Sequence, residues 1–191
     1  MTKLKRLTKN LPLKRKNTAI LVSGTPGTGK TTIAKYLTKI LNSRLKTSKI
    51  KQKQGKIYKY LDVNKLIKNN NLADHYDKQK KSYIVDEKRL TKHLEKLMNS
   101  SKNTLIIDSH MSHFLRSTFS SICIITICSN LKTLKHRLER RNYSKDKVRE
   151  NLDSEIFQTC LNEAKELKHN ILVVDTAKPW KTKLKSSIKS L

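Results

Sequence analysis

Short apolar runs alternate along the chain with stretches in which apolar residues recur every three or four positions. The apolar runs predict five strands, at about residues 18–23, 57–62, 104–108, 122–128 and 171–175. The helical spacing predicts helices over residues 30–42, 86–98, 130–141, 144–168 and 180–188, and a shorter helix that begins at Val63. Nearly uninterrupted apolar strands are typical of a parallel sheet covered on both faces. The pattern therefore predicts a three-layer α/β/α domain built on a five-stranded parallel sheet.

The segments around these elements divide the chain into an arm, a domain and a tail. Residues 1–17 are predicted to form a basic N-terminal arm, residues 18–178 the α/β domain, and residues 179–191 a basic C-terminal helix. Residues 43–56 are polar and basic, which predicts an exposed loop or ribbon. Residues 68–82 are polar and irregular, so residues 60–85 have the character of an insertion in which a second substrate could be held.

The net charge of the chain bears on the kind of partner that it binds. The net charge of +28 results from 43 Lys and Arg residues against 15 Asp and Glu residues. The first 61 residues contain seventeen of the basic residues and no acidic one, and five more lysines follow Asp175. A solvated, lysine-rich surface explains part of this excess. A field so one-sided also favours a polyanionic partner, and RNA is the partner we expect.

Nothing in the sequence predicts a membrane segment or a disulfide. No apolar run approaches the ~18 residues of a membrane span, and the basic N-terminus lacks the apolar stretch of a secretory signal. Cys123, Cys128 and Cys160 form no C-x-x-C pair, and the first two lie five residues apart on one predicted strand, facing opposite sides. Free thiols in a reducing cytosol, and hence a cytoplasmic protein, are the expectation.

A glycine-rich turn connects the first predicted strand to the first predicted helix. Gly24, Gly29, Lys30 and Thr31 fill every fixed position of the phosphate-binding pattern G-x-x-x-x-G-K-[ST]. Gly24, Gly27 and Gly29 permit backbone conformations in which successive N–H groups converge on phosphate oxygens. The helix that follows points the positive end of its dipole at the same site. The lysine would reach the β- and γ-phosphates and the threonine hydroxyl would ligate Mg²⁺. The pattern predicts binding of a nucleoside triphosphate.

A second group of candidate residues follows the predicted strand 104–108. Asp108 ends that strand, where the ligand crevice of a parallel sheet lies, and could hold Mg²⁺ directly or through water. His110 would orient water or substrate, and a structural hydrogen bond is the alternative. A metal pair of His110 and His113 is disfavoured, because no further ligands stand at matching spacing.

Three arginines stand at the end of the predicted helix 130–141. Arg137, Arg140 and Arg141 could be favoured there by the helix dipole alone. Guanidinium groups before the turn at residues 142–144 also suit a lid that closes over transferring phosphates.

Four stretches carry a family resemblance: residues 24–32, 106–115 (IIDSHMSHFL), 134–143 (LKHRLERRNY) and 148–164 (VRENLDSEIFQTCLNEA). On these residues the chain resembles the small adenylate kinase-like NTPases of archaea and eukaryotes, which include coilin-interacting nuclear ATPase protein. The similarity covers about residues 18–176. It implies a P-loop NTPase fold of the nucleoside monophosphate kinase type, with a monophosphate-binding region at 60–83 and a lid at 140–150.

The motif and the resemblance together assign the site residues. The nucleotide-binding set is Gly24, Gly27, Thr28, Gly29, Lys30, Thr31, Thr32 and Arg141; the Mg²⁺ set is Thr31 and Asp108; the catalytic set is Lys30, Asp108, His110, Arg137 and Arg141. Two positions depart from the family pattern. Lys68 replaces an arginine of the monophosphate region, and Asn142 replaces a glycine before the lid tyrosine. Lysine cannot form a bidentate fork, which speaks against efficient phosphorylation of AMP.

The resemblance implies an enzyme that converts ATP and AMP to two ADP and also hydrolyses ATP. It further implies a role in maturation of the small ribosomal subunit and its 16S-type rRNA, with pre-ribosomal RNA and a ribosomal protein as partners of a monomer or weak dimer. There are two alternatives: an ATPase assembly factor with little kinase activity, and a kinase of RNA ends. A GTPase is disfavoured, because TICSN stands after the fourth strand instead of an N-K-x-D guanine reader.

Overall fold

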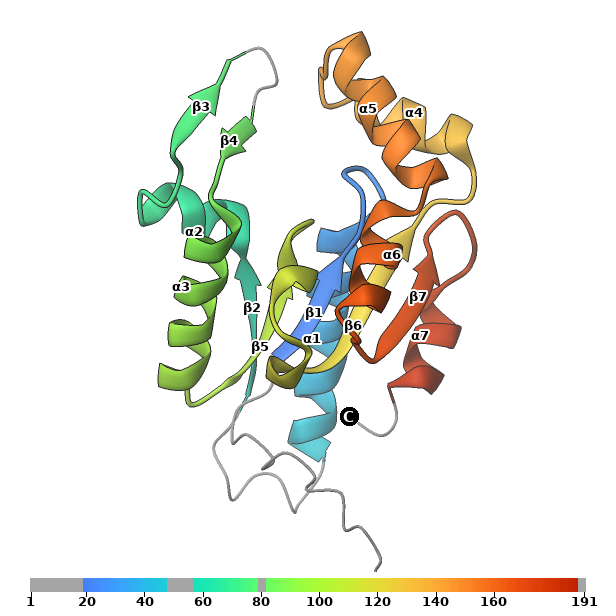
Figure 1. Ribbon diagram of the computed structural model, residues 1–191. Coiled ribbons are helices and arrows are strands. Elements are labelled where there is room, and N and C mark those ends of the chain that lie inside the picture. The colour runs from blue at the N-terminus through green and yellow to red at the C-terminus, as the bar shows by residue number, and fades with distance from the viewer. Residues whose placement is uncertain (1–18, 48–56, 79–81, 189–191) are drawn as a thin grey trace, which may run out of the picture.

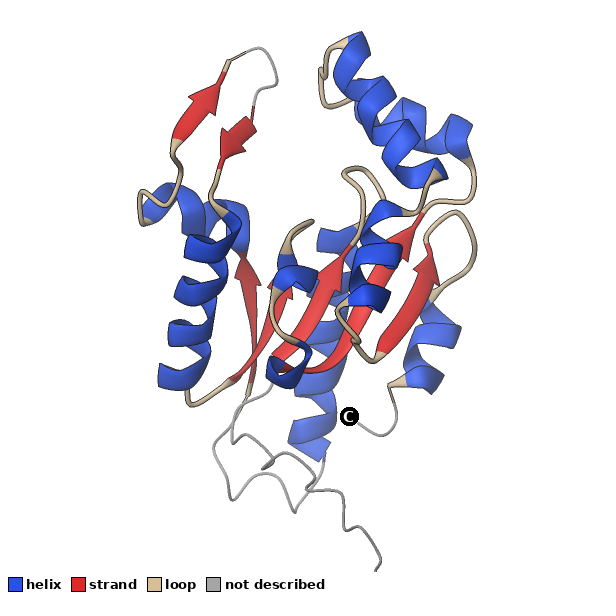
Figure 2. Cartoon of the chain, in the orientation of Figure 1, coloured by secondary structure: helices blue, strands red, loops and turns tan. Residues whose placement is uncertain are grey.

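Five strands form one parallel sheet at the centre of the molecule (Figures 1 and 2). The computed structural model describes residues 19–47, 57–78 and 82–188. The strand order is β2-β5-β1-β6-β7. The strands are β1 (Ala19–Ser23), β2 (Tyr58–Asp62), β5 (Thr104–Asp108), β6 (Ser120–Ile127) and β7 (Ile171–Asp175). The predicted five-stranded parallel sheet is confirmed, and β1 lies at its centre.

Helices cover both faces of this sheet, so the predicted three-layer architecture is confirmed. Helices α1 (Lys30–Thr47) and α7 (Lys181–Ser187) lie on one face. The other face carries α2 (Val63–Asn69), α3 (Glu87–Ser100), α6 (Thr159–Glu166) and the 3-10 turns η2 (Ser112–Phe114) and η3 (Ser117–Phe119). Because strand side chains alternate, Ile20 and Val22 of β1 pack toward α1, while Ala19 and Leu21 pack toward the opposite layer.

Two segments project from the sheet end that carries the glycine-rich loop (Figure 1). One is an antiparallel hairpin of β3 (His75–Asp77) and β4 (Ser82–Ile84), beside α2 and α3. The other is the pair α4 (Leu131–Glu139) and α5 (Lys145–Ile156), which has its own small apolar core. The hairpin falls largely within residues 60–83, and residues 140–150 comprise the connection between α4 and α5 and the first half of α5.

Three predicted elements were wrong. The first helix runs to Thr47 instead of ending near residue 42, so the start of the predicted loop 43–56 is helical. The polar stretch 68–82 is not irregular, because it contains β3. The predicted helix 144–168 is interrupted where Gln158 adopts the left-handed conformation (φ 51°). Two apolar residues of the predicted helix are exposed, Ile156 (54%) just before the break and Leu167 (39%) near the end of the predicted range.

Other predictions are confirmed or fall outside the described residues. Strand β5 and strand β7 have the predicted bounds, and Asp86 caps α3 by accepting a hydrogen bond from the Arg89 N–H. No helix in the described part of the chain is long and apolar enough to span a membrane. The predicted arm 1–17, and residues 48–56 of the predicted loop, lie outside the described residues.

Candidate active site

The glycine-rich loop connects the central strand β1 to α1. Gly24, Gly27 and Gly29 have φ values of 136°, 90° and 93°, which side chains other than hydrogen rarely tolerate. A Cβ on Gly24 would lie 2.2 Å from the Thr126 carbonyl oxygen, so a neighbouring strand closes off this position as well. The loop ends at the first turn of α1, whose N–H groups have no partners within the helix. The loop therefore has the form of an anion-binding site.

Lys30 lies folded back over this loop. Its Nζ donates hydrogen bonds to the carbonyl oxygens of Gly24 (2.7 Å) and Thr25 (2.9 Å). Desolvation, aided by the positive charge of Arg141, lowers the pKa of Lys30 from 10.5 to about 8. Among the residues that the structure describes, none forms a carboxylate ion pair with this ammonium group, and an anion in the loop would relieve the cost of its charge.

Asp108 connects the loop to the neighbouring strands. Its Oδ2 accepts hydrogen bonds from Thr31 Oγ1 at 2.6 Å and from the Tyr60 hydroxyl at 2.9 Å, and the residue is only 6% exposed. Burial and the charge of Asp108 raise the pKa of Tyr60 far above its usual range, so the phenol remains a donor. The two predicted Mg²⁺ ligands thus lie in contact. They present only oxygen donors, one carboxylate and one hydroxyl, which fits the preference of Mg²⁺ for few protein oxygens completed by water and phosphate.

The two histidines after β5 occupy different environments. His110 is exposed, while desolvation by neighbouring protein atoms and the charge of Lys30 lower its pKa below the usual 6.5. Its imidazole is therefore neutral at physiological pH and can accept or donate a hydrogen bond. His113 is buried and bonded to Ser23 and Glu163, so the structure does not pair the two histidines.

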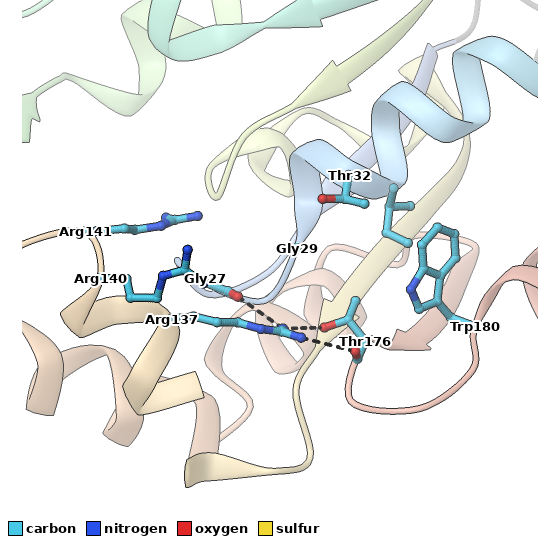
Figure 3. A pocket seen from close by; sticks show the side chains of 9 residues that line it. Gly27, Gly29, Thr32, Arg137, Arg140, Arg141, Thr176 and Trp180 are labelled. Carbon is cyan, nitrogen blue, oxygen red and sulfur yellow. Dashed lines mark hydrogen bonds between the residues drawn. The ribbon is translucent and has the colours of Figure 1, made fainter. Parts of the chain in front are cut away.

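A cavity of about 460 Å³ lies beside the loop on the side of α4 (Figure 3). It is lined by Gly27, Gly29, Thr32, Ile33, Arg137, Arg140, Arg141, Thr176 and Trp180. Arg137 donates to the Thr176 hydroxyl (3.0 Å) and carbonyl (3.3 Å), and to the Gly27 carbonyl (3.4 Å). Its guanidinium therefore braces the loop against the segment after β7. Arg140 and Arg141 are exposed at the mouth of the cavity.

The structure brings the predicted site residues together around the glycine-rich loop. One of them, Thr28, has a side chain that supports the loop instead of facing the nucleotide site. The hydroxyl of Thr28 points inward, donating to the Thr25 carbonyl (2.7 Å) and contacting the Thr126 hydroxyl (2.7 Å), so it supports the loop's shape. Sequence reasoning missed Tyr60 as a partner of Asp108, and missed Thr176 and Trp180 as lining residues. A tyrosine two residues before a strand end was the only sequence signal for Tyr60.

The fold and the site define a class. A parallel sheet whose central strand ends in a glycine-rich loop, with the loop lysine and a neighbouring-strand aspartate in place, is the arrangement of P-loop nucleotide-binding proteins. Residues 20–158 match the family described as AAA domain. The structure of shikimate kinase from Acinetobacter baumannii in complex with shikimate shares this fold, with a TM-score of 0.55 at 14% identity over 90% of this chain and 89% of that one.

Two relatives of similar sequence show to which family of P-loop proteins the chain belongs. The protein named "Putative adenylate kinase" of Methanocaldococcus jannaschii is 35% identical over 146 residues, which cover 76% of this chain and 71% of that protein. The protein named "Adenylate kinase isoenzyme 6 homolog FAP7" of Saccharomyces cerevisiae is 30% identical over 169 residues, covering 88% and 77%. The chain belongs to this adenylate kinase-like family of P-loop phosphotransferases, as the sequence motifs predicted.

Proposed function

We propose that this protein transfers the γ-phosphate of ATP to AMP, forming two ADP. The contact between Thr31 Oγ1 and Asp108 Oδ2 at the end of the glycine-rich loop carries the proposal, because these are the two side chains that we assign to Mg²⁺, beside the loop that we assign to phosphate. The adenylate kinase-like relatives support the choice of reaction. Segments projecting on both sides of the loop support two nucleotide sites.

In this proposal, each residue around the loop has a role that follows from its position. The triphosphate binds along the loop amides, and Lys30 turns from the carbonyls of Gly24 and Thr25 to the β- and γ-phosphates. Mg²⁺ held by Thr31 and Asp108 would neutralise charge that develops on the transferring group. The braced guanidinium of Arg137 keeps the loop rigid, which favours alignment of the reacting groups.

The two projecting segments supply the second substrate site and the exclusion of water. We assign residues 60–83 to the monophosphate and residues 140–150 to a lid. Arg141, exposed at the cavity mouth, would contact the nucleotide when the lid closes. Lys68 is exposed on α2, at the position where the family has an arginine. Its ammonium group cannot form the two parallel hydrogen bonds of a guanidinium with phosphate, so we expect a high KM for AMP.

Formation of ADP tests the kinase proposal. ATP and AMP together should yield ADP, and the bisubstrate mimic Ap₅A should inhibit at low concentration, because it spans both nucleotide sites. Lys30→Met should abolish the reaction, whereas Lys59→Met, at an exposed position of β2, should not change it. If ADP never forms from ATP plus AMP while ATP still binds, the kinase proposal is wrong.

The charge favours a second role for the same site. The net charge of +28 favours binding to a polyanion such as RNA. We propose that the protein also hydrolyses ATP in the cytoplasm while it is bound to pre-ribosomal RNA and a ribosomal protein, during maturation of the small subunit. His110, neutral and exposed near Lys30, would orient the attacking water. Co-sedimentation with small-subunit precursors should differ between ATP and ADP, and no association with either nucleotide would count against this role. Phosphorylation of RNA 5′ ends without AMP turnover would favour the alternative of an RNA kinase.

A further inference from the structure

A second set of metal-ligating side chains lies beside the glycine-rich loop and does not include Thr31 or Asp108. His113, Cys160 and Glu163 each offer one ligand atom, and these three atoms lie within 4.8 Å of one another. The set combines a nitrogen, a sulfur and a carboxylate oxygen, which differs from the oxygen donors at Asp108 and Thr31. None of the three has a part in the phosphoryl transfer proposed above.

The fold fixes these side chains in position. Cys160 and Glu163 lie three residues apart on α6, so they share one face of the helix. Helix α6 packs against η2, which carries His113. The histidine side chain is 1% exposed and that of Glu163 is 36% exposed, so the set is buried on one side and reachable from solvent on the other.

The contacts of the histidine place its Nε2 atom opposite the carboxylate of Glu163. The Ser23 hydroxyl contacts His113 Nδ1 at 2.6 Å and also donates to the His110 carbonyl at 3.2 Å. A hydroxyl has one hydrogen, so when it donates to the carbonyl, it must accept from an Nδ1–H. Neutral imidazole then has a bare Nε2, yet this atom lies 2.8 Å from Glu163 Oε2, which is also an acceptor. When the hydroxyl instead donates to Nδ1, the Nε2–H donates to Glu163. A proton then lies between Nε2 and the carboxylate in the free protein, and Zn²⁺ binding would replace that proton.

We propose that His113, Cys160 and Glu163 bind Zn²⁺, with water as the fourth ligand. Neutral imidazole, thiolate and carboxylate together balance the two charges of the ion, and the thiol proton is released to solvent on binding. Ser23 fixes the imidazole through Nδ1, as partners behind metal-bound histidines commonly do. Because Ser23 is the last residue of β1, the metal would tie α6 to the root of the glycine-rich loop.

Metal binding to the untagged full chain tests this site. After dialysis in excess Mg²⁺ without nucleotide, wild-type protein should retain about one equivalent of Zn²⁺. Co²⁺ in its place should give a near-ultraviolet thiolate-to-cobalt charge-transfer band, which the oxygen-only site at Asp108 cannot produce. Cys160→Ser should remove the band and Glu163→Gln should weaken binding at least tenfold. Glu166→Gln, an exposed control on the same helix, should change neither.

A measurement on wild-type protein keeps the test independent of variant folding. Cys160 is partly exposed while Cys123 and Cys128 are buried, so alkylation should label Cys160 first. Stoichiometric Zn²⁺ should protect it, as read by peptide mass spectrometry, and should raise Tm by a few degrees. Absence of a thiolate band, a band that survives Cys160→Ser, or unprotected Cys160 at saturating Zn²⁺ would each overturn the proposal.

Discussion

Lys30 gives the sharpest test of how the site handles charge. In the free protein, desolvation lowers its pKa from 10.5 to about 8, while its Nζ donates hydrogen bonds to the backbone carbonyls of Gly24 and Thr25. Phosphates in the loop favour the charged form and should return this pKa to its ordinary value or above. Nucleotide binding should therefore take up protons between about pH 8 and pH 10.5, with about half a proton at pH 8, where half of the free lysine is neutral.

The same shift sets the pH dependence of affinity. Only the protonated lysine binds phosphate well, and about one tenth of Lys30 is protonated at pH 9, so ATP should bind about tenfold more weakly there than near pH 6.5. Isothermal titration calorimetry in buffers of different ionisation enthalpy measures the proton uptake directly.

Lys30→Arg is the matched control, because arginine keeps its charge throughout this range. It should show no lysine-linked uptake. Equal uptake by wild type and Lys30→Arg, or no uptake by wild type at about pH 8, would refute the reasoning.

Two further substitutions test the frame of the site. Gly24→Ala forces φ 136° on alanine and a Cβ 2.2 Å from the Thr126 carbonyl, so we expect a loss of about 2–4 kcal/mol in unfolding free energy and at least tenfold in ATP affinity. Urea unfolding and nucleotide titration measure these, and Pro26→Ala in the same loop should be near neutral. Glu155→Ala removes the acceptor of the buried Cys128 N–H (2.6 Å) and should cost about 1–3 kcal/mol in urea unfolding. A cost below 0.5 kcal/mol would show that water replaces the carboxylate there.

The sequence was sufficient for the sheet and the phosphate loop, because both depend on local patterns. An uninterrupted apolar run ending in Asp108 predicted a buried strand with a carboxylate at its end, and the structure has the strand with those bounds. Strand order is not a local property. The contact between Tyr60 and Asp108 depends on β2 pairing with β5, where Tyr60 lies opposite Ile106, and no pattern within either strand reveals that pairing.

The helix break at Gln158 shows a second limit. Apolar spacing continues from α5 into α6, and no Gly or Pro marks the break, so a single helix was the natural prediction. The structure instead turns the chain with a left-handed glutamine and leaves Phe157 71% exposed. Tertiary packing of α6 on the sheet and of α5 on α4 overrides the local preference. The His113, Cys160 and Glu163 set was missed for the same reason, because it depends on where α6 packs.

The fate of the γ-phosphate tests the central claim most directly. With γ-labelled ATP and excess AMP, wild-type protein should place the label in ADP. His110→Ala should slow the release of labelled inorganic phosphate that occurs without AMP, while ATP binding is retained. Without AMP, a slower release of labelled inorganic phosphate should remain. Label that appears only as inorganic phosphate, at a rate unaffected by AMP, would contradict the claim that this site transfers phosphate to a nucleoside monophosphate.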